Sequence, residues 1–276
     1  MGAHKWSPIV QIINHKLKDE WYKASPNTSG KLVNPSLIIQ HYTASGGVNG
    51  IGDADYLSKS AAKASAHVVV GRDGSIQQIV PFDVKAWHAG VSIWRGRSNV
   101  NDFSIGIEID NWGPLTRTED GRYRSWSGAI VDPGSVVKAK HKYENVERYW
   151  ETFTEKQILA VAELTELLMK TYPSIKEVIG HEDIARGRKS DPGPAFPWHK
   201  ILSIVEGRKD AKVDRRRVIA SALNLRGGAG TQFDRVGAAL KKGEEVIVVY
   251  DAGKWAQIKV ADGRTGWVDD SWLEII

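Results

Sequence analysis

Two histidines and one aspartate stand out in this sequence as side chains that could bind a metal ion together. His181 and Asp191 lie ten residues apart in a segment rich in glycine and proline, and His41 ends an apolar run far upstream. Two imidazoles and one carboxylate are a ligand set of catalytic zinc sites, whose fourth position holds water. Glu108 lies in a strand-like run between them and could present a carboxylate to that water. The pattern predicts metal-assisted hydrolysis, with one Zn²⁺ per chain.

Apolar runs would place these side chains at the ends of buried strands. The run 37–41 ends at His41, and its continuous apolar character is typical of a strand covered on both faces. The run 103–109 alternates, so that three isoleucines share one face and Glu108 shares the other with small residues. Residues 67–80 have the pattern of a hairpin with a central glycine turn. We therefore expect an α/β domain with a mixed sheet and the site at its strand ends.

Three helices are predicted around this sheet. Thr154 and Gln157 form a capping-box pattern at the start of a helix that should end near Thr171. A short alanine-rich helix is expected over 53–63. Ser7 and Pro8, followed by apolar residues up to Leu17, predict an N-terminal helix.

The composition changes after Trp198 and indicates a second domain. All ten prolines lie before that point, and the following stretch is strongly charged. Short apolar runs separated by turns then continue to the end of the chain, which is typical of a small β-barrel. We predict a catalytic domain over 1–205 with an N-terminal helical extension, a linker over 206–215 and an all-β domain over 216–276.

Length, composition and net charge limit the classes of protein to which this chain can belong. The 276 residues suffice for two domains, and the absence of cysteine excludes disulfides and thiolate ligands. A net charge of +5 gives a weak attraction to polyanions, but no coherent basic face is visible, so no nucleic-acid partner is expected. No run is long enough to span a bilayer, and no signal-peptide pattern is present. We expect no membrane insertion and a protein that is cytoplasmic as synthesised.

Several segments resemble the zinc-dependent N-acetylmuramoyl-L-alanine amidases of type 2. They are Gln40–Ala44, Ser104–Ile109, Gly180–Ile184 and Lys189–Pro194. The resemblance implies the type-2 amidase fold, a mixed sheet flanked by helices. It also implies a zinc enzyme that separates the cell-wall peptide from its sugar.

The C-terminal residues 218–276 resemble a bacterial SH3-like domain, most clearly at Ala222–Thr231 and Gly266–Val268. Such domains often accompany cell-wall hydrolases and are thought to hold them on peptidoglycan. A purely structural or dimerising role stays open.

The resemblance also assigns roles to individual residues. It implies the ligands His41, His181 and Asp191, with Glu108 as the catalytic acid and base and Lys189 as a cation near the carbonyl oxygen. The residues expected to bind substrate are Trp87, His88, Arg97, Asn111 and Trp112.

Structural alternatives remain for four of these assignments. Glu108 could be an edge-strand residue that faces solvent, and Lys189 could belong to a surface trio with Arg186 and Arg188. His88 could be a structural histidine. The aromatic-rich segment 111–150, which holds Trp112, could line a cleft or simply pack on the domain.

The expected substrate is polymeric peptidoglycan, cleaved by a lytic enzyme similar to an endolysin. The SH3-like domain favours this reading, as does Asn99, which replaces a basic residue that we associate with recycling amidases. The first alternative is a cytosolic recycling amidase that acts on anhydro-muropeptides, which the segments around His88 and Glu108 resemble. The second is a non-catalytic peptidoglycan receptor.

Overall fold

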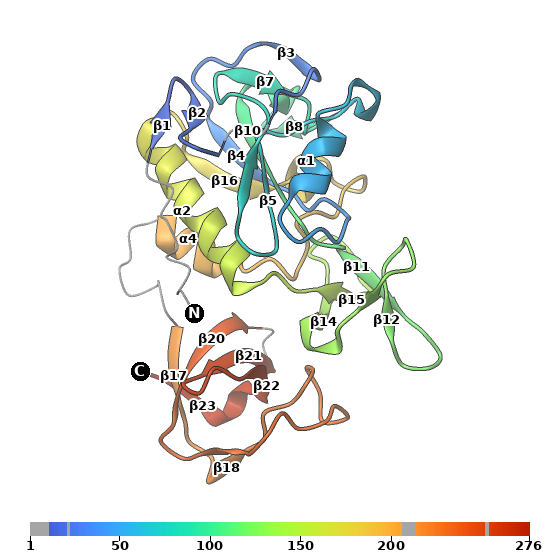
Figure 1. The fold of residues 1–276 in the computed structure, drawn as a ribbon, viewed down its shortest axis with the longest axis vertical. Coiled ribbons are helices and arrows are strands. Elements are labelled where there is room, and N and C mark those ends of the chain that lie inside the picture. Colours follow the sequence, from blue (N-terminus) through green and yellow to red (C-terminus); the bar gives the residue numbers. More distant parts are fainter. Residues whose placement is uncertain (1–10, 21–22, 206–213, 252–253) are drawn as a thin grey trace. The chain divides into compact units, whose positions relative to one another are not determined.

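The computed structural model describes residues 11–20, 23–205, 214–251 and 254–276 (Figure 1). Contacts divide the chain into two compact units. The first contains the residues up to Asn111 together with Lys156–Pro192, and the second contains Trp112–Glu155 together with Gly193–Ile276. No helix among the described residues is both long and apolar enough to cross a bilayer.

A five-stranded mixed sheet forms the centre of the first unit. Its strands follow the order β16 (Glu177–Gly180), β4 (Leu37–Gln40), β10 (Ser104–Ile109), β5 (Val68–Val70) and β6 (Ile76–Gln78). The first four are mutually parallel, and β6 runs antiparallel to β5. The isoleucines of β10 are fully buried, as expected of a parallel strand covered on both faces. The predicted mixed sheet is confirmed.

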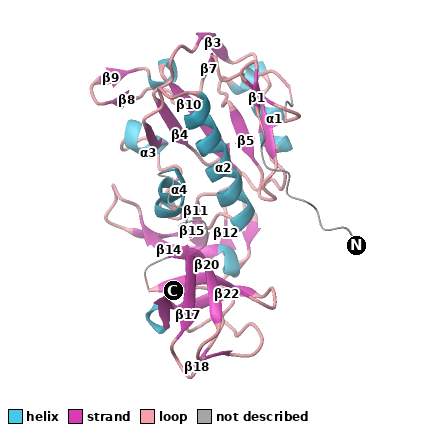
Figure 2. Ribbon diagram, turned by 90° about the vertical axis from the view of Figure 1, so that its left-hand side faces the viewer, coloured by secondary structure: helices cyan, strands magenta, loops and turns pink. Residues whose placement is uncertain are grey.

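Helices cover this sheet. α2 (Glu155–Thr171) runs across one face (Figure 2) and buries the apolar stripe that its sequence predicts. α1 (Ile51–Leu57) packs its Ala54 against Val69 and Ile79. The helix predicted over 53–63 is shorter than expected, because the chain leaves α1 at Leu57 and continues as the 3₁₀ turn Ser60–Ala62. Other elements of the first unit are β3 (Thr28–Lys31), β7 (Val84–Ala86), β8 (Ile93–Trp94), β9 (Arg97–Ser98), the 3₁₀ turn Val100–Asp102 and α3 (His181–Ile184).

The N-terminal helix prediction is wrong for the part of it that the structure describes. Residues 11–17 form a hairpin of β1 (Ile12–Ile13) and β2 (Lys16–Leu17). Its two turn residues, Asn14 and His15, have φ values of 49° and 62°. Two consecutive residues with positive φ are the signature of a type I′ hairpin turn, which the apolar spacing alone could not reveal. Ser7 and Pro8 lie outside the described residues.

The second unit contains two antiparallel sheets. One is formed by the segment that follows the glutamate strand, in the order β13 (Ile130–Val131), β12 (Tyr123–Arg124), β11 (Pro114–Arg117), β15 (Glu147–Glu151) and β14 (Val136–Lys140). We call this segment, residues 112–155, the insertion. The other sheet has the order β22 (Thr265–Asp269), β21 (Trp255–Val260), β20 (Glu245–Asp251), β17 (Asp214–Val218) and β23 (Leu273–Ile275). A small ladder of β18 (Ala222–Leu223) and β19 (Leu240–Lys241) accompanies it, and α4 (Trp198–Val205) precedes it.

The all-β C-terminal domain is confirmed. Its core is built from alternating apolar residues of β20 and β21, as the short apolar runs predict. Most of the predicted linker, residues 206–213, lies outside the described residues. β17 begins at Asp214, two residues before the predicted start of this domain.

The insertion packs against the C-terminal barrel. The carbonyl oxygen of Gly134 accepts hydrogen bonds from Trp267 Nε1 and Gln257 Nε2, both at 2.9 Å. Phe233 packs onto the apolar cluster that contains Leu115 and Tyr123 of the insertion. At least part of the aromatic content of this segment therefore serves packing, which is one of the two readings that the sequence left open.

A buried carboxyl next to the central strand gives a testable pH dependence. Asp110 is fully buried, and its Oδ2 accepts a hydrogen bond from the Gly50 amide at 3.1 Å. Burial, and then the hydrogen bond with Asp53, raises the pKa of Asp110 to about 9. The folded protein therefore keeps a proton that the unfolded chain releases near pH 4, so the free energy of unfolding should fall as pH rises from about 4 to 9.

We expect Asp110→Asn to remove this slope, which can reach about 1.4 kcal/mol per pH unit. The asparagine amide can still accept from Gly50 and can donate to Asp53. Urea unfolding between pH 5 and pH 9 measures the effect, with the exposed Asp102→Asn as control. Identical slopes in the wild type and the Asp110 variant would contradict the prediction.

Candidate metal centre

Strand register brings the predicted ligands together. β16, β4 and β10 are parallel neighbours, and Gln40 of β4 is paired with Gly180 on one side and Ile107 on the other. His181 and His41 are the first residues after the ends of β16 and β4, and Glu108 is the next residue of β10. They therefore emerge at the same edge of the sheet, although they are far apart in the sequence.

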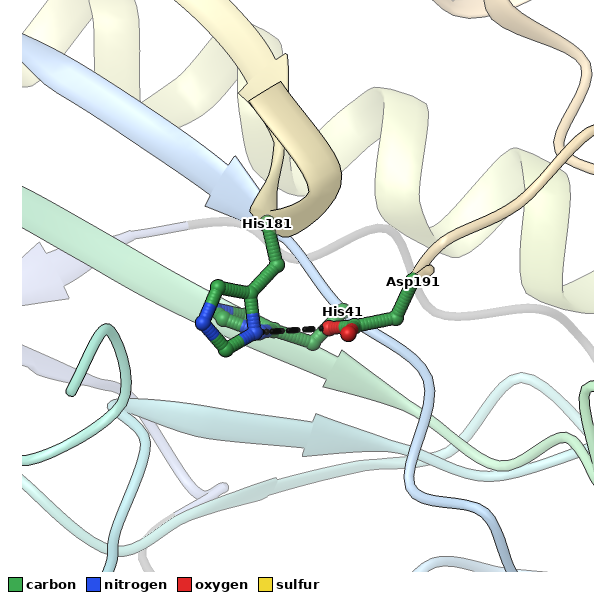
Figure 3. Close-up of side chains that lie close together, drawn as sticks. All are labelled: His41, His181 and Asp191. Atoms are coloured by element: carbon green, nitrogen blue, oxygen red, sulfur yellow. Dashed lines mark hydrogen bonds and ion pairs between the residues drawn. The ribbon is translucent and has the colours of Figure 1, made fainter. Parts of the chain in front are cut away.

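Three side-chain atoms converge at this edge (Figure 3). His41 Nδ1 lies 3.0 Å from His181 Nδ1, and the Asp191 Oδ2 atom is 3.0 Å from the first and 2.9 Å from the second. The exposed fractions of the three residues are 1%, 3% and 5% for His41, His181 and Asp191. Ligands held at about 2.0–2.1 Å in a tetrahedral zinc site lie roughly 3.3 Å apart. The triangle is therefore of a suitable size for one metal ion.

The chemistry of the donor set also fits a metal. Burial, and then the neighbouring His181, lowers the pKa of His41 to about 4, so this ring is neutral at neutral pH. Burial disfavours the charged form of Asp191, but the adjacent imidazole rings of His181 and His41 outweigh it and hold its pKa below the usual value. The His181 Nε2 atom lies 3.0 Å from the Ala89 carbonyl oxygen, which can only accept, so the proton of this ring is on Nε2. The Nδ1 lone pair of His181 thus faces a carboxylate, an arrangement that a cation stabilises.

Glu108 lies beside this triangle on a central strand, with β4 and β5 on either side. The alternative of a solvent-facing edge-strand residue is therefore not what the structure shows. Its Oε1 atom is 4.0 Å from His41 Nδ1, its side chain is 17% exposed, and Oε2 is buried without a hydrogen-bond partner. Burial, and then the negative charge of Asp191, raises the pKa of Glu108 well above the usual value. Such a carboxylate is suited to accept a proton from a group at the triangle.

Lys189 is exposed and lies close enough to the centre to act on it electrostatically. Burial dominates the pKa shifts of His41 and Glu108, and the positive charge of Lys189 contributes a smaller lowering to both. Its neighbour Arg188 points elsewhere, with Nη2 donating to the carbonyl oxygens of Ala89 and Val91 at 2.8 and 2.7 Å. The two cations of this loop therefore have different environments.

The residues predicted to bind substrate do not lie together. Trp87 lines a cavity of about 1250 Å³ in the first unit, whereas Arg97 stacks its guanidinium 3.7 Å above the Phe103 ring. Asn111 is buried just after β10. Trp112 belongs to the second unit, where it packs on the cluster of the insertion.

His88 is 7% exposed and lies behind the metal site, with its Nδ1 3.1 Å from His41 Nε2. Burial, and then the neighbouring His41, lowers the pKa of His88 well below its usual value. Its position agrees with the structural reading that the sequence left open for it.

Sequence reasoning missed most of the cavity lining. Besides Trp87, the wall contains four cationic residues and the indole of Trp94; the cations are Lys63, Arg95, Arg186 and Arg188. Of these cations, the sequence singles out only Arg186 and Arg188, as members of a surface trio with Lys189. The clustering of charges from three separate segments is a property of the fold that no local pattern encodes.

Comparison with known proteins decides the family. A family model described as N-acetylmuramoyl-L-alanine amidase matches residues 31–194, and a bacterial SH3 domain model matches residues 221–274. The chain belongs to the N-acetylmuramoyl-L-alanine amidase family. Both resemblances found in the sequence are thereby confirmed, together with the fold class.

Curated relatives of this amidase family member come from enterobacteria, among other sources. The 1,6-anhydro-N-acetylmuramyl-L-alanine amidase AmpD of Escherichia coli (strain K12) is 38% identical over 144 residues, covering 52% of this chain and 59% of the relative. The N-acetylmuramoyl-L-alanine amidase AmiD of the same strain is 30% identical over 195 residues, covering 67% of this chain and 59% of the relative. The chain thus spans about three fifths of the length of these relatives.

A solved structure agrees with the amidase assignment. The crystal structure of a Se-Met AmpD derivative superposes with a TM-score of 0.51 at 30% sequence identity. It covers 71% of this chain and 99% of that chain.

Proposed function

We propose that this protein is a zinc-dependent N-acetylmuramoyl-L-alanine amidase, which hydrolyses the amide between the lactyl group of N-acetylmuramic acid and L-alanine. The observation that carries the proposal is the buried triangle of His41, His181 and Asp191, with the Glu108 carboxyl 4.0 Å from one of its corners. A metal with three protein ligands keeps an open position for water or substrate, which is the arrangement of catalytic zinc sites.

The chain's own residues would divide the reaction between them. When bound, zinc lowers the pKa of a coordinated water toward about 7 and polarises a carbonyl group. Glu108 accepts the proton of the attacking water and delivers it to the leaving amine of L-alanine, which requires a basic carboxylate within reach of both. Lys189 supplies a positive charge near the carbonyl oxygen, where negative charge develops.

The cavity in the first unit supports an acidic peptide-sugar substrate. Its cationic residues, with Trp87 and Trp94, can pair with carboxylates and stack on sugar faces. The intact ligand set, with Glu108 and Lys189 present, argues against the non-catalytic receptor.

We propose polymeric peptidoglycan as the substrate, because a barrel of the bacterial SH3 class accompanies the catalytic residues. A soluble anhydro-muropeptide is the second candidate. It is favoured by the identity of 38% with an enzyme described as a 1,6-anhydro-N-acetylmuramyl-L-alanine amidase.

Purified protein assayed on both substrates, with and without a chelator, tests the proposal. Mass spectrometry should identify free stem peptide released from intact sacculi, and the release should stop when the metal is removed. Release from the soluble anhydro compound alone would favour the second candidate. No release of stem peptide from either substrate by zinc-loaded protein would refute the amidase assignment.

A further inference from the structure

The dipeptide His88–Ala89 contacts both ligand histidines on the side away from the metal site. His41 Nε2 lies 3.1 Å from His88 Nδ1, and His181 Nε2 lies 3.0 Å from the Ala89 carbonyl oxygen. Two rings that are far apart in the sequence, one just after β4 and one at the start of α3, are thus held by one two-residue segment between β7 and β8. No residue of this segment can ligate the metal at the positions seen, because His41 and His181 separate it from the triangle.

The hydrogen-bond directions around His88 can be worked out from one hydroxyl group. Ser104 Oγ donates its only proton to the Val100 carbonyl oxygen at 2.6 Å, so toward His88 Nε2, at 3.2 Å, it must accept. A neutral imidazole has one N–H, which for His88 is therefore on Nε2. Its Nδ1 accepts, and His41 must carry its own proton on Nε2. The Nδ1 atom of His41 is left with a lone pair directed at the metal site.

A single contact sets the same tautomer in His181, with the proton on Nε2. The Ala89 carbonyl oxygen can only accept, so it fixes the proton of His181 on Nε2. Arg188 donates to the same oxygen at 2.8 Å, which further restrains its position. Both ligand histidines therefore direct an Nδ1 lone pair at the metal site, and the two residues that set their tautomers, His88 and Ala89, are neighbours in the sequence.

The His88–Ala89 dipeptide is held in place by the side chain of Asn101, and its ring fits closely against Gly106, which has no side chain. Asn101 Oδ1 accepts hydrogen bonds from the backbone amides of His88 and Ala89, at 3.1 and 2.8 Å. The His88 ring lies directly on β10 at Gly106, where a Cβ atom would come within 2.4 Å of His88 Cγ. Any side chain at this position would displace the ring from His41.

We propose that His88 and Asn101 are positioning residues of the metal centre, which set the tautomer and direction of both ligand histidines. The proposal rests on the metal site of the proposed function but not on its substrate. His88 acts on His41 alone, whereas Asn101 acts on both ligands because it anchors both residues of the dipeptide. This role for His88 differs from the substrate contact expected from the resemblance.

The wild-type protein provides the first test, without any variant. Long-range ¹H–¹⁵N correlation spectra of metal-free, ¹⁵N-histidine-labelled protein report which ring nitrogen carries the proton. We expect protons on Nε2 of His41, His88 and His181. A proton on Nδ1 of His41 or of His88 would overturn the proposal, whatever the activity of the enzyme.

Paired variants provide the second test, read out as the zinc dissociation constant in competition with a chromophoric chelator. Loss of a partner that orients a metal-bound histidine typically weakens metal binding by about 10–100-fold. We expect His88→Leu to weaken binding by this amount and to mix the tautomers of His41 while leaving those of His181 unchanged. His88→Asn should restore much of the affinity, because its Oδ1 can accept in place of Nδ1.

Asn101→Leu should weaken binding and disturb both histidines, and Asn101→Asp, which keeps the accepting oxygen, should not. His15→Leu, remote from the site on the β1–β2 turn, is the matched control. Zinc affinity within about twofold of wild type in folded His88→Leu and Asn101→Leu would overturn the proposal. Because no substrate is used, failure here is distinguishable from failure of the amidase assignment.

Should His88→Leu fail to fold, Ser104→Ala removes the acceptor that orients His88 and should mix the same tautomers.

Discussion

Replacing Glu108 with glutamine should leave the metal site filled and abolish most of the amidase activity. The Glu108 carboxyl is buried beside the triangle, with one oxygen 4.0 Å from His41 Nδ1 and the other without a hydrogen-bond partner. Glutamine has nearly the same shape but cannot accept and pass on a proton. General acid–base catalysis contributes typically about 10²–10⁴-fold, so kcat should fall by that factor with little change in zinc content.

The same substitution should not destabilise the protein. Burial, and then the charge of Asp191, raises the pKa of Glu108, so the folded state disfavours its charged form. Removing the ionisable group removes that cost, and we expect an unchanged or higher melting temperature. Glu166→Gln, on the exposed side of α2 where the carboxylate pairs with Lys170, is the matched control. Full zinc occupancy with unaltered turnover in Glu108→Gln would exclude this residue from the mechanism.

The sequence predicts the strands of the catalytic sheet well because buried parallel strands leave a strong local signal. The runs ending at His41 and Glu108 are continuous or alternating apolar stretches, and each is a strand in the structure. What the sequence does not contain is the register. Only the pairing of Gln40 with both Gly180 and Ile107 explains why three distant residues emerge side by side.

The groups that orient the site are harder to predict because much of their chemistry is in the backbone. The Ala89 carbonyl fixes a ligand histidine, yet alanine carries no functional side chain that a motif could reveal. Asn101 acts through backbone amides, and Gly106 acts through the absence of a side chain. Such roles depend on distances between segments and become visible only in three dimensions.

The insertion shows a different limit of sequence reasoning. Its many aromatic residues were equally compatible with a substrate-binding rim and with simple packing. In the structure Tyr123 and Trp150 are buried, whereas Trp126 is largely exposed. Buried and exposed positions of the insertion both carry aromatic residues, so only the fold of this segment distinguishes the two. Strands of two residues, such as β12 and β13, also give too short a pattern to be recognised.

Replacing His181 with alanine should remove metal binding and activity together, in contrast to the Glu108 variant. His181 Nδ1 is one corner of the triangle, 2.9 Å from Asp191 Oδ2. Its loss leaves two protein ligands, and zinc sites in proteins ordinarily use three or four. We expect no zinc after gel filtration and no measurable release of stem peptide.

Thermal unfolding then separates loss of the metal from loss of the fold. A ligand that binds only the folded state stabilises it by about 2.7 kcal/mol at a concentration of 100 times its dissociation constant. The wild-type melting temperature should therefore rise with added zinc and fall with a chelator, whereas that of His181→Ala should respond to neither. His15→Ala, which changes a histidine away from the triangle, should respond as the wild type does. Zinc-dependent stabilisation that persists in His181→Ala would mean that the ion binds elsewhere, and the assignment of His41, His181 and Asp191 as ligands would then be wrong.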